Sequence, residues 1–370
     1  MITVREVTTA QDLDRFVKLP FAIYQGDPNW VSPLLSDLKR TLTPGKNPFW
    51  THAERKLFLA EKDSRPVGRV CATVDANYNG FHKSSIGFFG FFESTDDQET
   101  ANALIAAACR WCREKGMTMV YGPANPSLND EAGLLLDGFD SPPLVKMSYN
   151  PRYYEKLIQA AGLCKVKDLH AYVVAADRPM PEKYTRVIEM LKAKPGVKVR
   201  PIDLKHLKED LESIKEIYND AWSDNWDFAP MTSEEIDDMA KQLKPLIVPE
   251  LCPMVFCKGE PAAMSIALPD YNQVLARLGG RLLPFGWLKF LIYKGKITRG
   301  RLWALGVKAK FRHQGFDSLL YYESLVAARK LGYKQGEVSW ILEDNLSIIR
   351  PILNLGGRLY KTYRVYQQPL

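Results

Sequence analysis

Apolar and polar positions follow one another along the chain in two similar series. Each half predicts, in order, a strand, a helix, a hairpin, a strand, a helix, a strand, a helix and a last strand. The hairpins fall at 56–74 (KLFLAEKDSRPVGRVCATV) and 253–268 (PMVFCKGEPAAMSIAL), where apolar runs flank a turn containing Gly, Pro or Asp-Ser. Strands that alternate with helices predict an α/β fold with a mixed sheet in each half.

The two series are offset by the same distance near both ends. Val4-Arg5-Glu6-Val7 aligns with Val199-Arg200-Pro201-Ile202, and Gly162 aligns with Gly357, in each case 195 residues further along. Equal offsets predict two copies of one fold, at 1–176 and 197–370. Residues 177–196 between them predict a linking helix that is bounded by prolines.

Composition narrows the class of protein. Hydrophobic residues make up 46% and charged residues 25%, which is typical of folded globular proteins. The first residues show no apolar core followed by a small-residue cleavage site, and no run reaches the ~20 apolar residues of a membrane span, so we expect no secretory signal and a cytoplasmic protein. The excess of 50 basic over 43 acidic residues, a net +7, suits anionic ligands or an acidic lipid surface but is too small to indicate nucleic acid.

The six cysteines predict neither a disulfide framework nor a metal site. They are scattered over 370 residues, which fits a reducing compartment. Cys109 and Cys112 form a C-x-x-C inside a helical pattern, but no second pair or nearby histidine completes a zinc ligand set. We therefore expect no metal.

A short basic loop joins a strand to a helix in the second half. Residues 302–307 are an apolar strand, the loop at 308–315 carries Lys308, Lys310, Arg312 and His313, and the following helix ends at Gly332. A helix N-terminus presents unpaired N–H groups and a partial positive charge, and a glycine lets a ligand approach the backbone. The pattern predicts a pyrophosphate site, with an ordinary surface turn as the alternative.

Residues 312–317, Arg-His-Gln-Gly-Phe-Asp, resemble the R/Q-x-x-G-x-G/A motif of the GNAT superfamily of acyl-CoA-dependent N-acyltransferases. The resemblance covers roughly 197–370, and the N-terminal half only in outline. It implies two tandem GNAT-like domains and acetyl-CoA or a longer acyl-CoA as substrate. By position it assigns the pantetheine arm to the backbone of Leu305, Gly306 and Val307, the pyrophosphate to Arg312, His313, Gln314, Gly315 and Phe316, and a contact near the thioester to Asn345.

The chain departs from the family pattern at two positions. Asp317 stands where the family has Gly or Ala, and Ile352 stands where many members have the tyrosine that protonates the leaving thiolate. Tyr360, Tyr363 and Tyr366 on the last strand are the alternatives for that acid, of which we select Tyr363. Glu343, beside Asp344, is the candidate acceptor for the amine proton, with a solvated strand end as the other interpretation.

The first half has no equivalent loop. After its strand IGFFGFFES (86–94) the chain is acidic, with Asp96, Asp97 and Glu99 where a phosphate would need Arg and Gly, so this copy is expected to be degenerate and not to bind CoA. Its long polar loop contains Asn129, Asp130 and Glu131, which we select as contacts for a cationic amine substrate. The alternative is a capped connection without a role in binding.

An apolar insertion precedes the cofactor strand of the second half. Residues 281–294 are rich in Leu, Phe and Trp and are flanked by Arg and Lys, a pattern typical of interfacial helices, although a helix packed on the neighbouring domain has the same pattern. The overall plan also resembles the GNAT-like bacterial ceramide synthase branch, whose members join a fatty acyl group to a sphingoid amine. We therefore predict an acyl-CoA:amine N-acyltransferase acting on a small-molecule or lipid-like amine, with peripheral membrane contact through 281–294. The alternatives are an acetyl-CoA transferase for a soluble amine and a non-catalytic CoA-binding protein.

Overall fold

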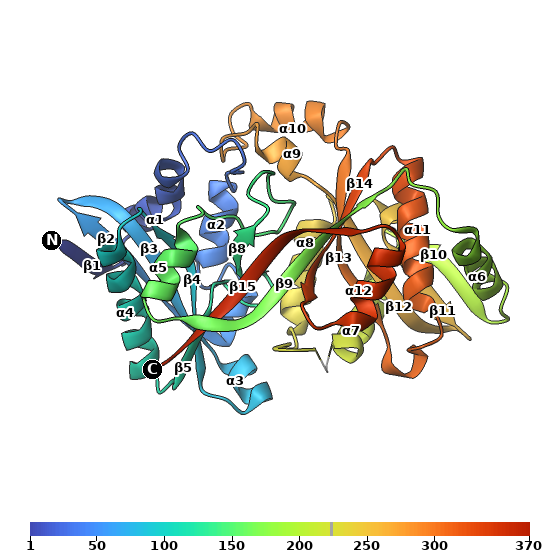
Figure 1. Ribbon diagram of the computed structural model, residues 1–370, viewed down its shortest axis with the longest axis horizontal. Coiled ribbons are helices and arrows are strands. Elements are labelled where there is room, and N and C mark those ends of the chain that lie inside the picture. The colour runs from blue at the N-terminus through green and yellow to red at the C-terminus, as the bar shows by residue number, and fades with distance from the viewer. Residues whose placement is uncertain (223–224) are drawn as a thin grey trace. The chain divides into compact units, whose positions relative to one another are not determined.

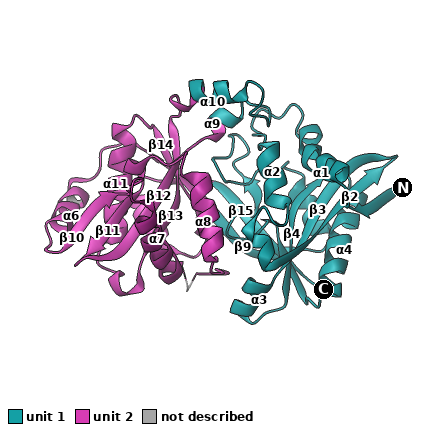
Figure 2. Ribbon diagram, turned by 180° about the vertical axis from the view of Figure 1, so that it is seen from behind, with its two compact units in different colours: residues 1–169, 274–292, 361–370 teal, residues 170–273, 293–360 magenta. Residues whose placement is uncertain are grey.

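The computed structural model describes residues 1–222 and 225–370, with Lys183 described by its backbone alone. The chain forms two compact units, each built from several segments (Figure 2). Unit 1 comprises 1–169, 274–292 and 361–370, and unit 2 comprises 170–273 and 293–360. The units are defined by spatial proximity, so the proposed copies at 1–176 and 197–370 stay a prediction. No helix in the described ranges combines the length and apolar character that crossing a membrane requires.

Unit 1 contains a mixed sheet flanked by helices (Figure 1). Its strands are β1 (Ile2–Glu6), β2 (Ala53–Lys62), β3 (Arg65–Asp75), β4 (Ile86–Ser94), β5 (Met119–Gly122), β6 (Ala124–Asn125), β7 (Glu131–Ala132) and β8 (Leu134–Asp137). Its helices are α1 (Ala10–Ile23), α2 (Leu35–Leu42), α3 (Ala76–His82), α4 (Gln98–Glu114) and α5 (Tyr154–Ala160), with the 3-10 turn η1 (Pro48–Thr51). Strands β1 to β4 pair antiparallel in sequence order, and β5 pairs parallel to β4.

Unit 2 repeats this order. Its strands are β10 (Val197–Pro201), β11 (Pro253–Cys257), β12 (Glu260–Pro269), β13 (Arg299–Val307) and β14 (Gln335–Leu342). Its helices are α6 (Glu182–Lys192), α7 (Leu207–Trp222), α8 (Ser233–Leu243), α11 (Phe316–Lys330) and α12 (Leu346–Asn354), with the turns η2 (Pro249–Leu251) and η3 (Ala309–Phe311). Strands β10 to β13 pair antiparallel in order, and β14 pairs parallel to β13. The predicted α/β class and both hairpins are thus confirmed.

The chain passes from one unit to the other within four of its elements. Strands β9 (Cys164–Ala175) and β15 (Arg358–Pro369) each run from one unit into the other, and helices α9 (Asn272–Leu275) and α10 (Gly286–Lys294) begin and end the inserted segment. Within unit 1 the end of β15 pairs antiparallel with β5, and its middle pairs with β8. The last residues of the chain therefore complete the sheet of unit 1.

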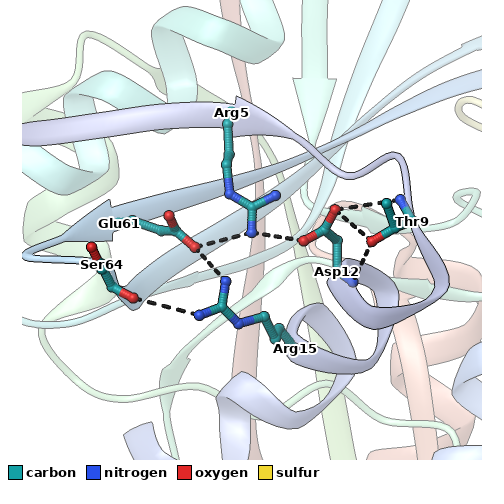
Figure 3. Close-up of polar contacts among 6 residues, drawn as sticks. All are labelled: Arg5, Thr9, Asp12, Arg15, Glu61 and Ser64. Carbon is teal, nitrogen blue, oxygen red and sulfur yellow. Dashed lines mark hydrogen bonds and ion pairs between the residues drawn. The ribbon is translucent and has the colours of Figure 1, made fainter.

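A polar network at the start of unit 1 ties β1, β2 and α1 together (Figure 3). The Arg5 guanidinium contacts the carboxylates of Asp12 at 2.8 Å and Glu61 at 3.0 Å, and Arg15 reaches the same Glu61 at 2.9 Å. Asp12 also completes a capping box with Thr9 at the N-terminus of α1. The hydrogen bond from Arg5 holds the pKa of Asp12 down at about 2.

Each unit has its own apolar core. In unit 1, α4 packs its buried face on the sheet so closely that an added Cβ at Gly68 would lie 2.6 Å from Leu104. Cys112 is fully buried in that core, and burial raises the pKa of its thiol to about 12. In unit 2, Phe316 and Leu319 of α11 pack with Ile188 and Leu191 of α6, the helix expected to link the two copies. These contacts fix α11 against its sheet.

Candidate active site

Strands β13 and β14 separate before either of them ends. Their parallel pairing runs from Arg299 opposite Gln335 to Leu302 opposite Val338, whereas β13 continues to Val307 and β14 to Leu342. On its other edge β13 stays paired with β12 as far as Val307. Because a strand carries hydrogen-bonding groups on both edges, the edge of 303–307 that faces away from β12 can bind an extended ligand.

Backbone irregularities mark the point of separation. The pairing of β13 with β12 shifts by one residue around Trp303, which is a β-bulge, and Trp340 on β14 has a φ of +58°. A bulge bends its strand and increases the local twist. The two irregularities therefore lie where the strands part.

Leu305, Gly306 and Val307 lie in the strand predicted at 302–307, on the part of β13 that is separated from β14. At Gly306 the ring of Trp222, at the end of α7, comes so close that an added Cβ would overlap it. Glycine is needed here because α7 packs on the backbone of β13. The contact places the end of α7 beside the strand that is expected to bind the pantetheine arm.

The loop after β13 leads to an open helix N-terminus. Gly315 is the N-cap of α11, has a φ of +83°, and offers no side chain to the N–H groups of the first turn. Those groups, with the helix dipole, favour an anion. The guanidinium of Arg312 donates a hydrogen bond of 3.3 Å to the carbonyl of Ala221, which holds the arginine at the end of α7. His313 and Gln314 are exposed on the same loop.

Two of the basic residues in this loop already have acidic partners. The ammonium group of Lys308, which is buried, pairs with Glu216 on α7, and that of Lys310 pairs with Glu260 on β12. The hydrogen bond with Glu260 raises the pKa of Lys310. The sequence could not reveal these pairs, since the partners lie 92 and 50 residues away. The positive character of the loop therefore comes mainly from Arg312 and the helix terminus.

Asp317, the departure from the family motif, lies in the first turn of α11 near two tyrosines. Burial, with a smaller contribution from the charge of Asp317, raises the pKa of Tyr184 to about 12. The same two causes raise the pKa of Tyr321. The hydroxyl of Tyr184 donates a 2.8 Å hydrogen bond to the carbonyl of Ser318, so α6 contacts the first turn of α11 next to Asp317.

The polar end of β14 leads into α12. Asn345 is the N-cap of α12, and its side-chain oxygen accepts a 2.6 Å hydrogen bond from Ser347. Glu343 is half-buried at the end of β14, and Asp344 is exposed. Glu343 and Asn345 therefore lie between the end of β14 and the start of α12, and their roles stay predictions.

The candidate acids have different surroundings. Ile352 is 1% exposed in an apolar cluster with Ile349 and Tyr321, so that position supplies no proton. The hydroxyl of Tyr360 donates a hydrogen bond to the carboxylate of the buried Glu337 in the same unit. Tyr363, our selected acid, is fully buried in unit 1, where it pairs with Leu135. Its assignment as acid stays a prediction.

A buried polar group beside the separation point was missed by the sequence analysis. Arg301 and Glu337 are paired residues of β13 and β14, with the Arg301 Nε 3.6 Å from a Glu337 carboxylate oxygen. Arg301 also donates to Ser339 at 2.7 Å, and its guanidinium lies 4.7 Å from the ring centre of Trp340. Charged residues at strand starts are usually exposed, so only the pairing of the two strands reveals this contact.

Unit 1 has the same separation of strands, but its own chain fills it. The pairing of β4 with β5 ends at Phe88 opposite Tyr121, while β4 continues to Ser94. There the side-chain oxygen of Asn125 accepts a 2.5 Å hydrogen bond from the Phe91 N–H, and an added Cβ at Gly90 would overlap the carbonyl of Ala124. The backbone of β6 thus occupies the space along β4.

The helix after β4 is closed as well. Asp97 is the N-cap of α4, and its carboxylate accepts hydrogen bonds from the N–H of Glu99 and, at 2.7 Å, from the hydroxyl of Thr100. The bond from Thr100 lowers the pKa of Asp97, which favours the charged form. An acidic cap repels phosphate, so the degenerate character of this copy has two physical causes.

Of the three residues selected for substrate contact, Asn129 and Asp130 lie in the loop that follows β6, and Glu131 begins β7. Asp130 accepts a 2.7 Å hydrogen bond from the Ser127 hydroxyl, which in turn accepts from the N–H of Asn129 at 3.2 Å. Glu131 pairs with Asn125 in the short ladder of β6 and β7. These bonds give the loop a defined shape within unit 1, and its contact with an amine stays a prediction.

Sequence comparisons identify relatives of the chain along its whole length. No protein-family model matches the chain. It is 38% identical over 378 residues to a protein named bacterial ceramide synthase from Caulobacter vibrioides (strain NA1000 / CB15N), which covers 100% of this chain and 98% of that relative. It is 31% identical over 377 residues to Protein YghO of Escherichia coli (strain K12), which covers 99% and 95%.

A solved structure gives the same fold. A tandem GNAT protein from the clavulanic acid biosynthesis pathway matches with a TM-score of 0.61 over 100% of this chain and 98% of that one, at 11% identity. The fold is therefore that of a tandem GNAT protein. Together with the relative at 38% identity, it defines the class of the protein as that of the N-acyltransferases. Within it, this chain belongs to the family that includes the bacterial ceramide synthase of Caulobacter vibrioides.

Proposed function

We propose that the protein transfers a long acyl group from acyl-CoA to the amino group of a lipid-like, sphingoid-type amine. The observation that carries the proposal is the combination in unit 2 of separated strands with the uncapped helix terminus at Gly315, which together fit an extended thioester ending in a diphosphate. The choice of a long acyl group and a lipid-like amine is supported by the likeness to a protein named bacterial ceramide synthase.

The transfer is a direct attack on the thioester. The neutral amine forms a bond to the carbonyl carbon, the bond from that carbon to sulfur breaks, and CoA leaves as thiolate. The amine must lose one proton, for which we assign the Glu343 carboxylate, and the thiolate gains one proton, for which Tyr363 stays the candidate predicted from the sequence. Asn345 holds the thioester end of the acyl-CoA. Leu305, Gly306 and Val307 bind the pantetheine arm, and Arg312 to Phe316 bind the diphosphate.

The deciding experiment measures thiol release from acetyl-CoA and from palmitoyl-CoA, each with a sphingoid base and with a soluble amine such as spermidine. We expect turnover with palmitoyl-CoA and the sphingoid base, and a new amide by mass spectrometry. Turnover with acetyl-CoA and the soluble amine alone would instead establish the small-molecule acetyltransferase.

A non-catalytic CoA-binding protein is the second candidate, and the buried Ile352 at the usual acid position favours it. Calorimetry with CoA separates it from the enzyme. Binding of CoA without turnover of any pair of substrates would support the binding protein and refute the transferase.

A further inference from the structure

The inserted segment between β12 and β13, which contains α9 and α10, has a base that packs in unit 1 and an apolar end that is exposed. At its base, Val274 and Leu278 are buried in unit 1, and the carbonyl of Gly280 accepts a 3.0 Å hydrogen bond from the N–H of Leu35. Beyond it, Leu283 and Phe285 are 75% and 73% exposed. No residue of α10 is buried. The apolar end is therefore held in place while its side chains face solvent.

Helical spacing places the apolar and basic residues of α10 on defined sides. Trp287 and Leu291, like Leu288 and Ile292, are four residues apart and form one face, and all four are between 46% and 53% exposed. At 100° per residue, Lys294 and Lys289 fall on the two borders of this face, and both are exposed. Long lysine side chains at the border of an apolar face can extend toward lipid headgroups while the face enters the acyl region.

The charged residues near α10 indicate which kind of partner binds its apolar face. Between Asp270 and Asp317 the chain contains no acidic residue, and Arg281 and Lys296 add exposed cations next to α10. A second copy of the chain would bring identical lysines together across a twofold axis, which is unfavourable. An anionic lipid surface instead complements the cations and accepts the apolar face.

We infer that residues 281–296 dock the protein on the surface of an anionic bilayer. Leu283, Phe285 and the apolar face of α10 enter the headgroup region. The inference deepens the proposed function, on which it rests for its purpose: a lipid-like amine and its acylated product both reside in a membrane. Docking itself requires neither substrate, so it can be measured separately.

The test is sedimentation of the full chain with vesicles of equal parts phosphatidylglycerol and phosphatidylcholine, and with vesicles of phosphatidylcholine alone, without acyl-CoA or amine. We expect binding to the anionic vesicles that weakens as salt is raised. Each large apolar side chain that leaves water contributes about tenfold to the partition constant, so Leu283→Ser with Phe285→Ser should weaken binding by tenfold or more. Val187→Ser with Met190→Ser on α6, which replaces two apolar residues that are 48% and 66% exposed, is the control.

Several results would overturn the inference. Equal binding to neutral and anionic vesicles would do so, as would equal binding by the Leu283/Phe285 variant and the control. A wild-type dimer that the variant converts to monomers, without vesicle binding, would identify a second copy as the occupant. Lys289→Glu with Lys294→Glu gives an independent check on the charge. Acylation of a detergent-dispersed amine by the same variants is measured separately. A variant that acylates the amine but does not sediment with vesicles has lost docking alone, whereas absence of acylation by the wild type would contradict the proposed function and leave the docking result unaffected.

Discussion

Asp97 and Gly315 hold the same position, the N-cap, in the helices that follow equivalent strands of the two units. Asp97 closes the first turn of α4 with its carboxylate, whereas Gly315 leaves the first turn of α11 open. One copy therefore repels an anion at the place where the other attracts it. This difference explains why a duplicated fold has a single candidate cofactor site, and it can be tested by making the two positions alike.

Gly315→Asp should close the second helix terminus. The new carboxylate would cap the first-turn N–H groups and repel the diphosphate, and because hydrogen bonds to charged groups contribute about 1.5–3 kcal/mol each, CoA should bind roughly tenfold to a hundredfold more weakly. Calorimetry measures the affinity. An aspartate in the left-handed region also costs stability, about 1 kcal/mol, and its Cβ would lie 2.9 Å from Leu191.

Gly332→Asp is the matched control for that strain. Gly332 has the same φ of +83° and no neighbouring atom within 4 Å of an added Cβ. Both variants should lose stability in urea unfolding, but only Gly315→Asp should lose affinity. Equal affinities for CoA in the two variants would remove the diphosphate from this helix terminus.

Gly306→Ala should displace α7 from β13. The added methyl group would overlap the Trp222 ring, so we expect a loss of stability of about 1–3 kcal/mol, typical of overpacking, together with weaker CoA binding. Gly336→Ala on β14, where an added Cβ meets nothing, should have little effect. Adding Trp222→Leu to Gly306→Ala should restore much of the stability measured by urea unfolding, and no recovery would mean that the contact with Trp222 is not the cause.

Glu343→Gln tests the proposed proton acceptor. The amide keeps the size of the side chain but cannot take a proton at neutral pH, and loss of a general base lowers kcat by about 10²–10⁴-fold. KM for acyl-CoA should change little. Asp344→Asn, which removes the same charge at the adjacent exposed position, is the control. If both variants lose activity equally, the effect is one of charge at the strand end and Glu343 is not the base.

The network of Figure 3 predicts a response to acid in unit 1. Because Arg5 lowers the pKa of Asp12 from 3.8 to about 2, the carboxylate stabilises the fold above pH 3.8 and this contribution is lost as the pH falls toward 2. Asp12→Asn should therefore unfold at a lower urea concentration at neutral pH, and the difference from wild type should shrink below pH 4. Asp37→Asn, on α2 outside the network, controls for the loss of one negative charge. A difference that stays constant between pH 7 and pH 2 would contradict the linkage.

The sequence was sufficient for features that depend on local patterns. Alternating apolar residues predicted both hairpins, and the acidic start of α4 predicted its closed terminus because a capping carboxylate lies next to the N–H groups that it binds. The sequence likewise placed the end of the basic loop at Gly315, before the helix, and Gly315 is the N-cap of α11.

Features that depend on distant residues could not be predicted. The pairing of Lys308 with Glu216 joins a loop to a helix far away in sequence, and the contact of Trp222 with Gly306 depends on how α7 lies on the sheet. The strand β6 is two residues long and adjoins prolines, so it carries no periodic signal. Its place along β4 is visible only in three dimensions.

The position of β6 along β4 in unit 1 predicts how many thioester molecules one chain binds. Since the chain's own backbone holds the place along β4, titration with a thioester should saturate at one equivalent per polypeptide, although the fold is present twice. The half whose strand edge is filled in this way is also the one that includes residues 274–292, which contain the base of the inserted segment.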